Sequence, residues 1–464
     1  MTEKTFEDFN LDARIIKGLK GKKYTIPTQV QLKTLPHALS NESIIATSKT
    51  GSGKTLAFLI PILQKLLKLN WQKEDGLGAL ILTPTRELAI QIYEVLKDLT
   101  QFMNMNCGTI IGGTQKHILE KEKRMISSLS VIVATPGRML QHLEESYGLN
   151  ASNLEILVLD EADKMVEMGF KQDIEQIVRF LNDERQTLLF SATPNFLIDK
   201  IDCLNLQNYK IISENDSSEN VPAKLVQIYY QFGSIGQKIN CLNECLKKNL
   251  NKRIIVFFAT CKAVKFYNQL FLKIFKRNKN RFYILNGGMK QDKRIDTFKK
   301  FQTDKNGILF CTDLGSRGLD FQNISLVVQF DCPDTVETYF HRVGRTARNE
   351  ENGTSVIYLL DPEIKIIDHI RKGKPFSFDK NNKNKEIENI NIEKKSRSPK
   401  DDIHNNVLDV LKNDNELQNA AEKYLSSYQK FCKFGCKKYF ENHERIINDA
   451  FKYFKICDEN SVDE

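Results

Sequence analysis

The sequence predicts two tandem α/β domains, each a doubly wound parallel sheet, followed by a small C-terminal helical extension. Short apolar runs rich in β-branched residues recur between stretches of helical periodicity, and this whole pattern occurs twice. Continuous apolar runs are typical of strands that are buried on both faces. Strands that alternate with helices are joined by right-handed crossovers, which produce parallel sheets.

Ten apolar runs are the predicted strands, five in each domain. In chain order they are SIIAT (43–47), ALILT (79–83), SVIVAT (130–135), ILVLD (156–160), TLLFSAT (187–193), RIIVFFAT (253–260), FYILN (282–286), GILFCTD (307–313), SLVVQFD (325–331) and TSVIYLL (354–360). Several runs end in Thr, Ser or Asp. Because ligands bind at the carboxyl ends of strands in such sheets, this placement indicates functional residues.

Composition divides the rest of the chain. Residues 371–400 hold ten Lys/Arg against four Asp/Glu, which indicates a basic linker. Apolar residues at helical spacing beyond it predict helices that pack on the other domains. We therefore expect an N-terminal region at 1–34, a first α/β domain at 35–212, a linker at 213–224, a second α/β domain at 225–370, the basic linker at 371–400 and the helical extension at 401–464.

The chain has 464 residues, a net charge of +9 and ten cysteines. A modest basic excess permits nucleic-acid binding without establishing it. No signal peptide is visible, and no apolar run reaches the ~20 residues that span a bilayer. We expect an intracellular protein with reduced cysteines and no membrane partner. A zinc site at Cys432 and Cys436, with His443 and Cys457 downstream, is a less favoured alternative to free thiols.

A phosphate-binding loop is indicated by SKTGSGKT (48–55), between the first predicted strand and an apolar helix. Gly51 and Gly53 let backbone amides face a phosphate, and the helix N-terminus adds its dipole. Lys54 can reach the β- and γ-phosphates, and the Thr55 hydroxyl can hold Mg²⁺. A flexible surface loop is the alternative. The loop residues assigned to ATP binding are Ser48, Lys49, Thr50, Gly51, Ser52, Gly53, Lys54 and Thr55, of which Ser48 stands where Gly or Ala is usual.

Two further stretches fit phosphoryl transfer. DEAD (160–163) follows a predicted strand, so that Asp160 would hold Mg²⁺, largely through water, and Glu161 would orient the attacking water. HRVGRTAR (341–348) in the second domain offers Arg342, Arg345 and Arg348, of which the last two share a helical face and would act as arginine fingers. A solvated acidic turn and a surface salt-bridge helix are the alternatives.

Together with these stretches, further motifs make the chain resemble the DEAD-box ATP-dependent RNA helicases over nearly all of residues 1–370. They are YTIPTQVQ (24–31), PTREL (84–88), Gly112-Gly113, TPGR (135–138), SAT (191–193), FFAT (257–260), QDKR (291–294) and TDLGSRGLD (312–320). The resemblance implies two RecA-like domains, an RNA-stimulated ATPase and the cofactors ATP and Mg²⁺. The last motif usually carries alanines where Gly315 and Ser316 stand, which conserves size, so we expect no loss.

The resemblance also implies residue roles. Gln31 would read the adenine, Phe6 would stack on it, and Asp320 would approach the ribose. Coupling between hydrolysis and domain movement would fall to Asp163, Ser191, Thr193 and His341. RNA-binding residues would be Pro84, Thr85, Arg86, Gly112, Gly113, Thr135, Pro136, Gly137, Arg138, Arg294 and Thr312.

The subgroup is suggested by three stretches. Residues 401–464 resemble the helical extension of nucleolar members, and 75–96 and 327–348 look closest to those acting on small-subunit pre-rRNA. This resemblance implies a nucleolar monomer in ribosome biogenesis, with pre-rRNA or small nucleolar RNA duplexes as substrates and pre-ribosomal proteins as candidate partners. An ATP-gated RNA clamp that does not unwind, a motor acting on DNA and a purely structural RNA-binding protein are the alternatives.

Overall fold

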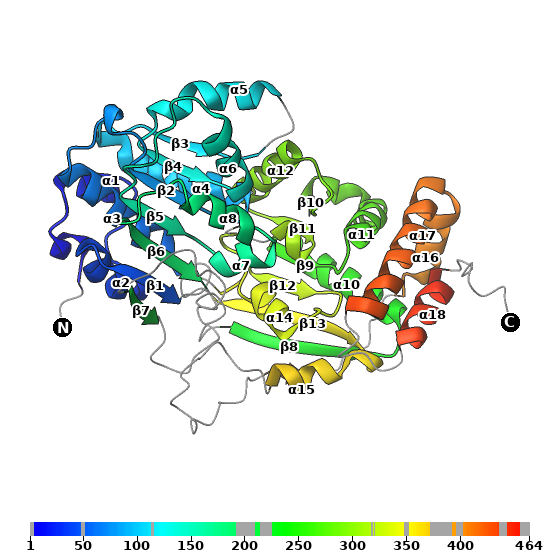
Figure 1. The fold of residues 1–464 in the computed structure, drawn as a ribbon. Coiled ribbons are helices and arrows are strands. Elements are labelled where there is room, and N and C mark those ends of the chain that lie inside the picture. The colour runs from blue at the N-terminus through cyan, green and yellow to red at the C-terminus, as the bar shows by residue number, and fades with distance from the viewer. Residues whose placement is uncertain are drawn as a thin grey trace. The chain divides into compact units, whose positions relative to one another are not determined.

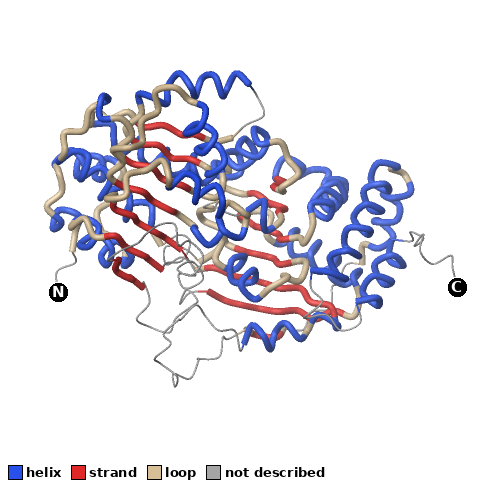
Figure 2. Tube along the Cα trace, viewed as in Figure 1, coloured by secondary structure: helices blue, strands red, loops and turns tan. Residues whose placement is uncertain are grey.

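The structure of the protein, a computed structural model, describes residues 4–47, 52–112, 116–191, 209–213, 225–316, 319, 321–347, 352–371, 392–395, 402–435 and 443–454. The chain forms two compact units, composed chiefly of Met1–Ser217 and of Ser218–Arg317 with Phe321–Glu464. Among the described residues, each unit contains one seven-stranded sheet, and helices flank each sheet (Figures 1 and 2). The predicted class of two α/β domains is confirmed.

The first unit alternates strands and helices. Its strands are β1 (Ser43–Thr47), β2 (Ala79–Leu82), β3 (Cys107–Ile110), β4 (Val131–Ala134), β5 (Ile156–Leu159), β6 (Gln186–Ser191) and β7 (Tyr209–Ser213). Its α-helices are α1 (Ala13–Gly21), α2 (Gln29–Leu39), α3 (Lys54–Lys68), α4 (Arg86–Leu99), α5 (Lys116–Met125), α6 (Pro136–Glu145), α7 (Ala162–Glu167) and α8 (Lys171–Val178). The strands run parallel in the order β3-β4-β2-β5-β6-β1-β7.

The second unit repeats the pattern. Its strands are β8 (Leu225–Phe232), β9 (Arg253–Phe257), β10 (Phe282–Leu285), β11 (Gly307–Cys311), β12 (Leu326–Gln329), β13 (Gly353–Leu360) and β14 (Glu393–Lys394). Its α-helices before the extension are α10 (Ile235–Lys248), α11 (Cys261–Ile274), α12 (Gln291–Thr303), α13 (Asp313–Ser316), α14 (Val336–Val343) and α15 (Lys365–Arg371). The parallel order β10-β11-β9-β12-β13-β8-β14 places its strands as in the first sheet.

The inner strands of the first sheet are buried on both faces, as their continuous apolar sequences predict, whereas β3 and β7 at its margins are partly exposed. In β1, Ile44 and Ala46 pack into a core with α1, α2, α3 and α4, whereas Ile45 packs into a second core with α6 and α8. Period-two alternation sends neighbouring side chains to opposite faces. The sheet therefore holds the carboxyl ends of its strands rigidly along one edge.

The helical extension belongs to the second unit. It comprises α16 (His404–Lys412), α17 (Asn415–Lys430), a π-helical turn at Phe431–Gly435 and α18 (His443–Phe454). The ring of Tyr424 stacks on Phe266 of α11 with centroids 5.2 Å apart, and Tyr267 donates a hydrogen bond to Tyr424 over 3.2 Å. The prediction that these helices pack on a domain is confirmed.

The zinc alternative falls partly outside the described residues. Cys436 and Cys457 are not described, and Cys432 is buried in the core of the second unit. Among the described parts of the chain, no helix is both long and apolar enough to cross a membrane.

Candidate nucleotide and RNA site

The start of α3 joins the predicted phosphate loop to the glutamine at position 31. Gly53 has φ of 94°, a conformation that favours glycine, and a Cβ there would lie 2.7 Å from Nε2 of Gln31. That Nε2 donates to the Gly53 carbonyl over 2.8 Å, while Oε1 of Gln31 accepts from the Thr28 amide over 2.9 Å. Ser48, Lys49, Thr50 and Gly51 lie outside the described residues.

Phe6, the predicted adenine-stacking residue, and Tyr24 differ in accessibility. Phe6 is only 2% exposed and packs in the first unit's core, whereas Tyr24, within 24–31, is 37% exposed. The resemblance assigns the adenine contact to Phe6. The sequence alone does not reveal how exposed either aromatic ring is in the folded protein. Asp320, the predicted ribose contact, lies outside the described residues.

Asp160 and Glu161 stand directly after β5. Asp160 is buried, and its Oδ1 accepts from the Glu161 amide over 3.0 Å. Glu161 caps α7 with φ of 51° and ψ of 47°. A left-handed conformation at a residue other than glycine costs about 1–3 kcal/mol, and such strain gathers at functional sites. The backbone thus turns sharply where the sequence predicts catalysis.

Electrostatics around Asp160 suit a bound cation. Burial raises the pKa of Asp160 to about 7, although the nearby charge of Lys54 opposes the rise, and the carboxylates of Glu161 and Asp163 add to it. Lys54 is itself buried and does not fully compensate Asp160. Carboxylate and hydroxyl oxygens are ligands that Mg²⁺ prefers, so Asp160 and Thr55 fit the metal that the family fold implies.

The carboxyl end of β6 lies between the ends of β1 and β5, which precede the phosphate loop and the DEAD segment. β6 pairs with β1 on one side and β5 on the other, with Ser191 opposite Thr47. Ser191 and Asp163 are both buried, and Thr193 lies outside the described residues. The phosphate-loop helix, the DEAD segment and Ser191 therefore follow three adjacent strands, β1, β5 and β6.

The predicted RNA-binding residues of the first unit follow the neighbouring strands β2, β3 and β4. After β2, Pro84 is followed by Thr85, whose hydroxyl caps α4 by accepting from the Leu88 amide. Gly112 lies beyond β3, where a Cβ would be 3.1 Å from the Arg86 guanidinium. The structure thus brings two of these motifs together; Gly113 lies outside the described residues.

The TPGR motif begins α6 after β4. Thr135 is the N-cap and Pro136 the first helical residue, and a Cβ on Gly137 would approach a carboxylate oxygen of Asp173 at 3.2 Å. Arg138 is 9% exposed, pairs with Glu122 at 3.1 Å and donates to Gln141 over 2.8 Å. The structure therefore places Arg138 in a buried polar cluster rather than on an open surface.

In the second unit, Thr312 follows β11 and its hydroxyl accepts from the Gly315 amide over 3.2 Å. A Cβ on Gly315 would lie only 2.4 Å from the Leu285 carbonyl oxygen, so glycine fits there without displacing backbone. Arg294 is half-buried on α12, after β10. These residues follow adjacent strands, as their counterparts do in the first sheet.

The three arginines of 341–348 have different settings. Arg342 on α14 is buried and donates to both carboxylate oxygens of Asp313 at 2.7 Å and to the Asp331 carbonyl at 2.7 Å. Burial lowers the pKa of Arg342, but Asp313 more than offsets this, and the net pKa is raised. His341 is half-buried and Arg345 is buried; Arg348 lies outside the described residues.

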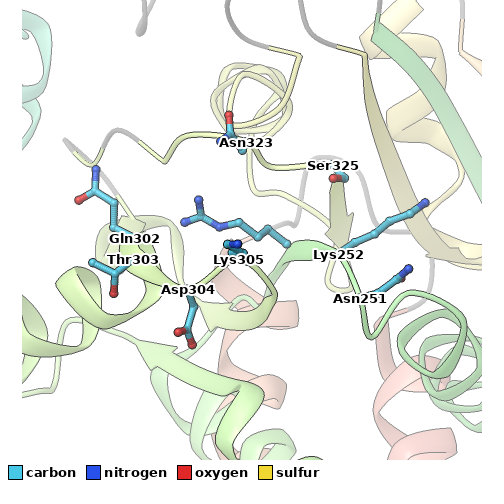
Figure 3. A pocket seen from close by; sticks show the side chains of 9 residues that line it. Asn251, Lys252, Gln302, Thr303, Asp304, Lys305, Asn323 and Ser325 are labelled. Atoms are coloured by element: carbon cyan, nitrogen blue, oxygen red, sulfur yellow. The ribbon is translucent and has the colours of Figure 1, made fainter. Parts of the chain in front are cut away.

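A polar cavity of about 370 Å³ lies elsewhere in the second unit (Figure 3). It is lined by Asn251, Lys252, Arg253, Gln302, Thr303, Asp304, Lys305, Asn323 and Ser325. These residues precede or begin β9, β11 and β12, at the sheet edge opposite the predicted site residues. The cavity is therefore separate from the predicted site.

The sequence of this chain is similar to those of known proteins. The sequence model of the DEAD/DEAH box helicases matches residues 28–201, and that of the helicase conserved C-terminal domain matches 237–350. A protein named ATP-dependent RNA helicase DBP4 from Encephalitozoon cuniculi is 44% identical over 98% of this chain and 99% of that protein. A human protein named probable ATP-dependent RNA helicase DDX10 is 37% identical over 91% of this chain, which spans 46% of the human protein's length.

Solved structures agree with these sequence matches. A DEAD-box helicase, Mss116, bound to single-stranded RNA and UDP-BeF covers 97% of this chain with a TM-score of 0.81 and 29% identity, over 90% of that chain. A second Mss116 structure, with single-stranded RNA and AMP-PNP, covers 98% of this chain and 91% of that chain with a TM-score of 0.79 and 31% identity. The chain belongs to the DEAD/DEAH box helicase family.

Proposed function

We propose that this protein is an ATP-dependent RNA helicase that locally unwinds or remodels RNA duplexes. One observation carries the proposal: the carboxyl edge of the first sheet is divided into adjoining halves. The predicted ATP residues follow β1, β5 and β6, and the predicted RNA residues follow β2, β3 and β4, which meet the first group where β2 pairs with β5. Relatives named ATP-dependent RNA helicases support it.

ATP is held at the start of α3 in this proposal. Lys54 binds the β- and γ-phosphates, and Thr55 and Asp160 hold Mg²⁺ largely through water. Mg²⁺ would neutralise phosphate charge. Glu161, fixed by its strained backbone, orients the attacking water, while Gln31 reads the adenine from its place beside Gly53. Structural neighbours bound to nucleotide analogues support this assignment.

RNA lies on the other half of the edge. Main-chain and polar groups at Thr85, Gly112 and Thr135 contact phosphates and sugars, which carry no base code, so binding is independent of sequence. Contacts to the 2′-hydroxyl favour RNA over DNA. Asp163 and Ser191, which follow β5 and end β6 within the ATP half, relay the nucleotide state together with Thr193 and His341. Arg345 and Arg348 add positive charge to the transferring phosphoryl group.

Two substitutions test the proposal. Lys54→Ala and Glu161→Gln should each reduce RNA-stimulated ATP hydrolysis by at least about 100-fold, because phosphate capture or water activation is lost. Lys68→Ala on the same helix and Glu167→Gln on α7, both at exposed positions, should leave turnover unchanged. Undiminished hydrolysis in either site variant would refute the assignment.

The RNA class is a finer part of the proposal. The resemblance of 401–464 to nucleolar members supports pre-rRNA or small nucleolar RNA duplexes as substrates, ribosome biogenesis as the process and the nucleolus as the location. Sequencing RNA crosslinked to the protein in cells would test this. Strand displacement measured beside ATP hydrolysis separates a helicase from an RNA clamp. ATP hydrolysis that is stimulated by RNA but not by DNA would exclude a DNA motor.

A further inference from the structure

The second sheet contains a buried lysine and carboxylate where the first sheet has its predicted ATP site. Lys54 is on the helix that follows the first strand, and Asp160 directly follows the fifth. In the second unit, Lys238 is on α10, after the first strand β8, and Asp331 lies just beyond the fifth strand, β12. Both second-unit side chains are 0% exposed. The second sheet therefore holds a lysine and an aspartate at positions equivalent to Lys54 and Asp160, but both side chains are fully buried.

A second carboxylate completes a buried charge cluster, which we define as Lys238, Asp331 and Glu363. Nζ of Lys238 lies 3.6 Å from Oε2 of Glu363 and 5.0 Å from the centroid of the Phe330 ring. Glu363 follows the sixth strand, β13, and accepts from the Leu360 amide over 2.7 Å. Burial raises the pKa of Asp331, and the charge of Lys238 opposes that rise, so Lys238 stabilises ionised Asp331.

The helical extension covers this cluster. Tyr428 on α17 and Cys432 just beyond it are buried in the same core as Phe330. Burial raises the pKa of both groups, and the negative charges of Glu363 and Asp331 raise it further. The extension thus keeps water from charges whose mutual attraction is strong only in a dry setting.

From the cluster, hydrogen bonds lead to the predicted arginine finger. The Asp331 carbonyl accepts from Nη1 of Arg342 over 2.7 Å, and its Oδ2 accepts from the Ala259 amide in FFAT over 2.8 Å. The Arg342 carbonyl in turn accepts from the Arg345 amide over 3.2 Å. The position of Asp331 therefore sets the backbone that presents Arg345.

We propose that Lys238 is a positioning residue for ATP hydrolysis, acting through Asp331 and Arg342 to hold Arg345 in its working position under the cover of the C-terminal extension. The inference rests on the proposed function, because it concerns the rate of that reaction. A buried Asp331 without its neutralising cation is driven to move or take up a proton. Either change shifts the carbonyl that Arg342 contacts.

The test compares full-length variants by kcat and KM for ATP at saturating RNA, per folded molecule. Lys238→Met should lower kcat at least about 10-fold while KM for ATP stays within about twofold, because Arg345 acts on hydrolysis rather than on binding. Ile447→Ala is the control for lost stability. It leaves a cavity at a buried position of α18 and should destabilise the protein, as Lys238→Met does, without changing the charge cluster. It should keep kcat.

Two further variants make the result decisive. Glu363→Gln alone should keep kcat within about twofold, since Lys238 still neutralises Asp331. Where Lys238→Met does not fold, Lys238→Met/Glu363→Gln removes the cation with its partner, and kcat should again fall 10-fold. If either Lys238 variant has the same kcat as Ile447→Ala, the role of Lys238 is refuted while the proposed function stands. Absence of RNA-stimulated hydrolysis in the wild-type chain overturns the proposed function and this inference together.

Discussion

The carboxyl edges of the two sheets share a strand order, but Asp160 of the first edge and Arg342 of the second differ in how their charges are compensated. In the first unit, Asp160 is buried beside Lys54, yet burial still raises its pKa to about 7. In the second unit, Arg342 has both donors of its fork on Asp313 and a third on the Asp331 carbonyl. An incompletely compensated carboxylate fits a site for a charged ligand, whereas a satisfied ion pair fits a rigid support.

The largest expected effect separates the arginine that acts on the reaction from the one that supports the fold. Arg345→Ala should reduce RNA-stimulated hydrolysis by about 10³-fold, the lower end of the range for arginine fingers, while ATP affinity is retained. Arg277→Ala, at an exposed position, is the matched control. Turnover and nucleotide binding should be measured on the same preparation; a large loss of affinity with normal turnover would contradict the assignment.

Arg342→Ala should act on stability instead. Arg342 is buried whereas the Asp313 side chain is 27% exposed, so we expect a cost of about 3 kcal/mol, the lower end of the range for breaking a buried ion pair. For a unit of this size that corresponds to a fall in Tm of about 10 °C. Arg342→Lys keeps the positive charge but loses the two parallel hydrogen bonds to the carboxylate. Its Tm should therefore lie between those of the wild-type protein and the alanine variant. An unchanged Tm in the alanine variant would remove the distinction between Arg342 and Arg345.

The sequence could predict the order of motifs and most strands, but not that Arg342 is held in the fold by Asp313. All ten predicted runs overlap observed strands, because continuous β-branched runs are a strong signal. Strands β3 (CGTI) and β7 (YKIIS) were missed because glycine or polar residues interrupt their apolar sequences. Strand β8 was missed because glutamine interrupts its apolar run, and β14 because it has only two residues.

Site residues show the same limit. The spacing of 341–348 singles out Arg345 and Arg348 as the predicted fingers, and only the position of Asp313 shows that Arg342 is engaged in the fold. Arg138 and Phe6 are buried although the resemblance assigns them contacts with RNA and adenine. Burial and pairing are properties of the folded chain, so motif spacing cannot supply them. The domain boundaries and the roles of individual site residues remain predictions.

Gly315→Ala tests how tightly the second edge is packed. Family members usually carry alanine there, and the sequence alone suggests that the exchange is neutral. In this chain the new Cβ would meet the Leu285 carbonyl oxygen at 2.4 Å, so we expect a loss of about 1–3 kcal/mol from overpacking. Ser316→Ala removes only a 3.2 Å hydrogen bond to the Asp313 carbonyl and should cost less. Thermal unfolding of both variants would decide; equal Tm values would show that the backbone yields freely.

The smallest effect on stability tests the first edge. Asp160→Asn should abolish hydrolysis yet raise the Tm of the ligand-free protein by a few degrees, at about 2–4 °C per kcal/mol, because a poorly compensated charge is replaced by a neutral group. The folded pKa of Asp160, about 7, lies above the ordinary value of 3.8. Ionisation therefore costs the wild-type fold stability as pH rises between these two values.

Asparagine does not ionise, so the advantage of the variant should be small near pH 4 and grow until about pH 7. Tm should be recorded for both proteins across this range without nucleotide or Mg²⁺. Asp173→Asn is a useful comparison, because burial raises the pKa of that carboxyl as well but it lies outside the DEAD segment, so hydrolysis should survive. An advantage that does not depend on pH would mean that Asp160 is compensated within the fold, and that the two edges do not differ as argued.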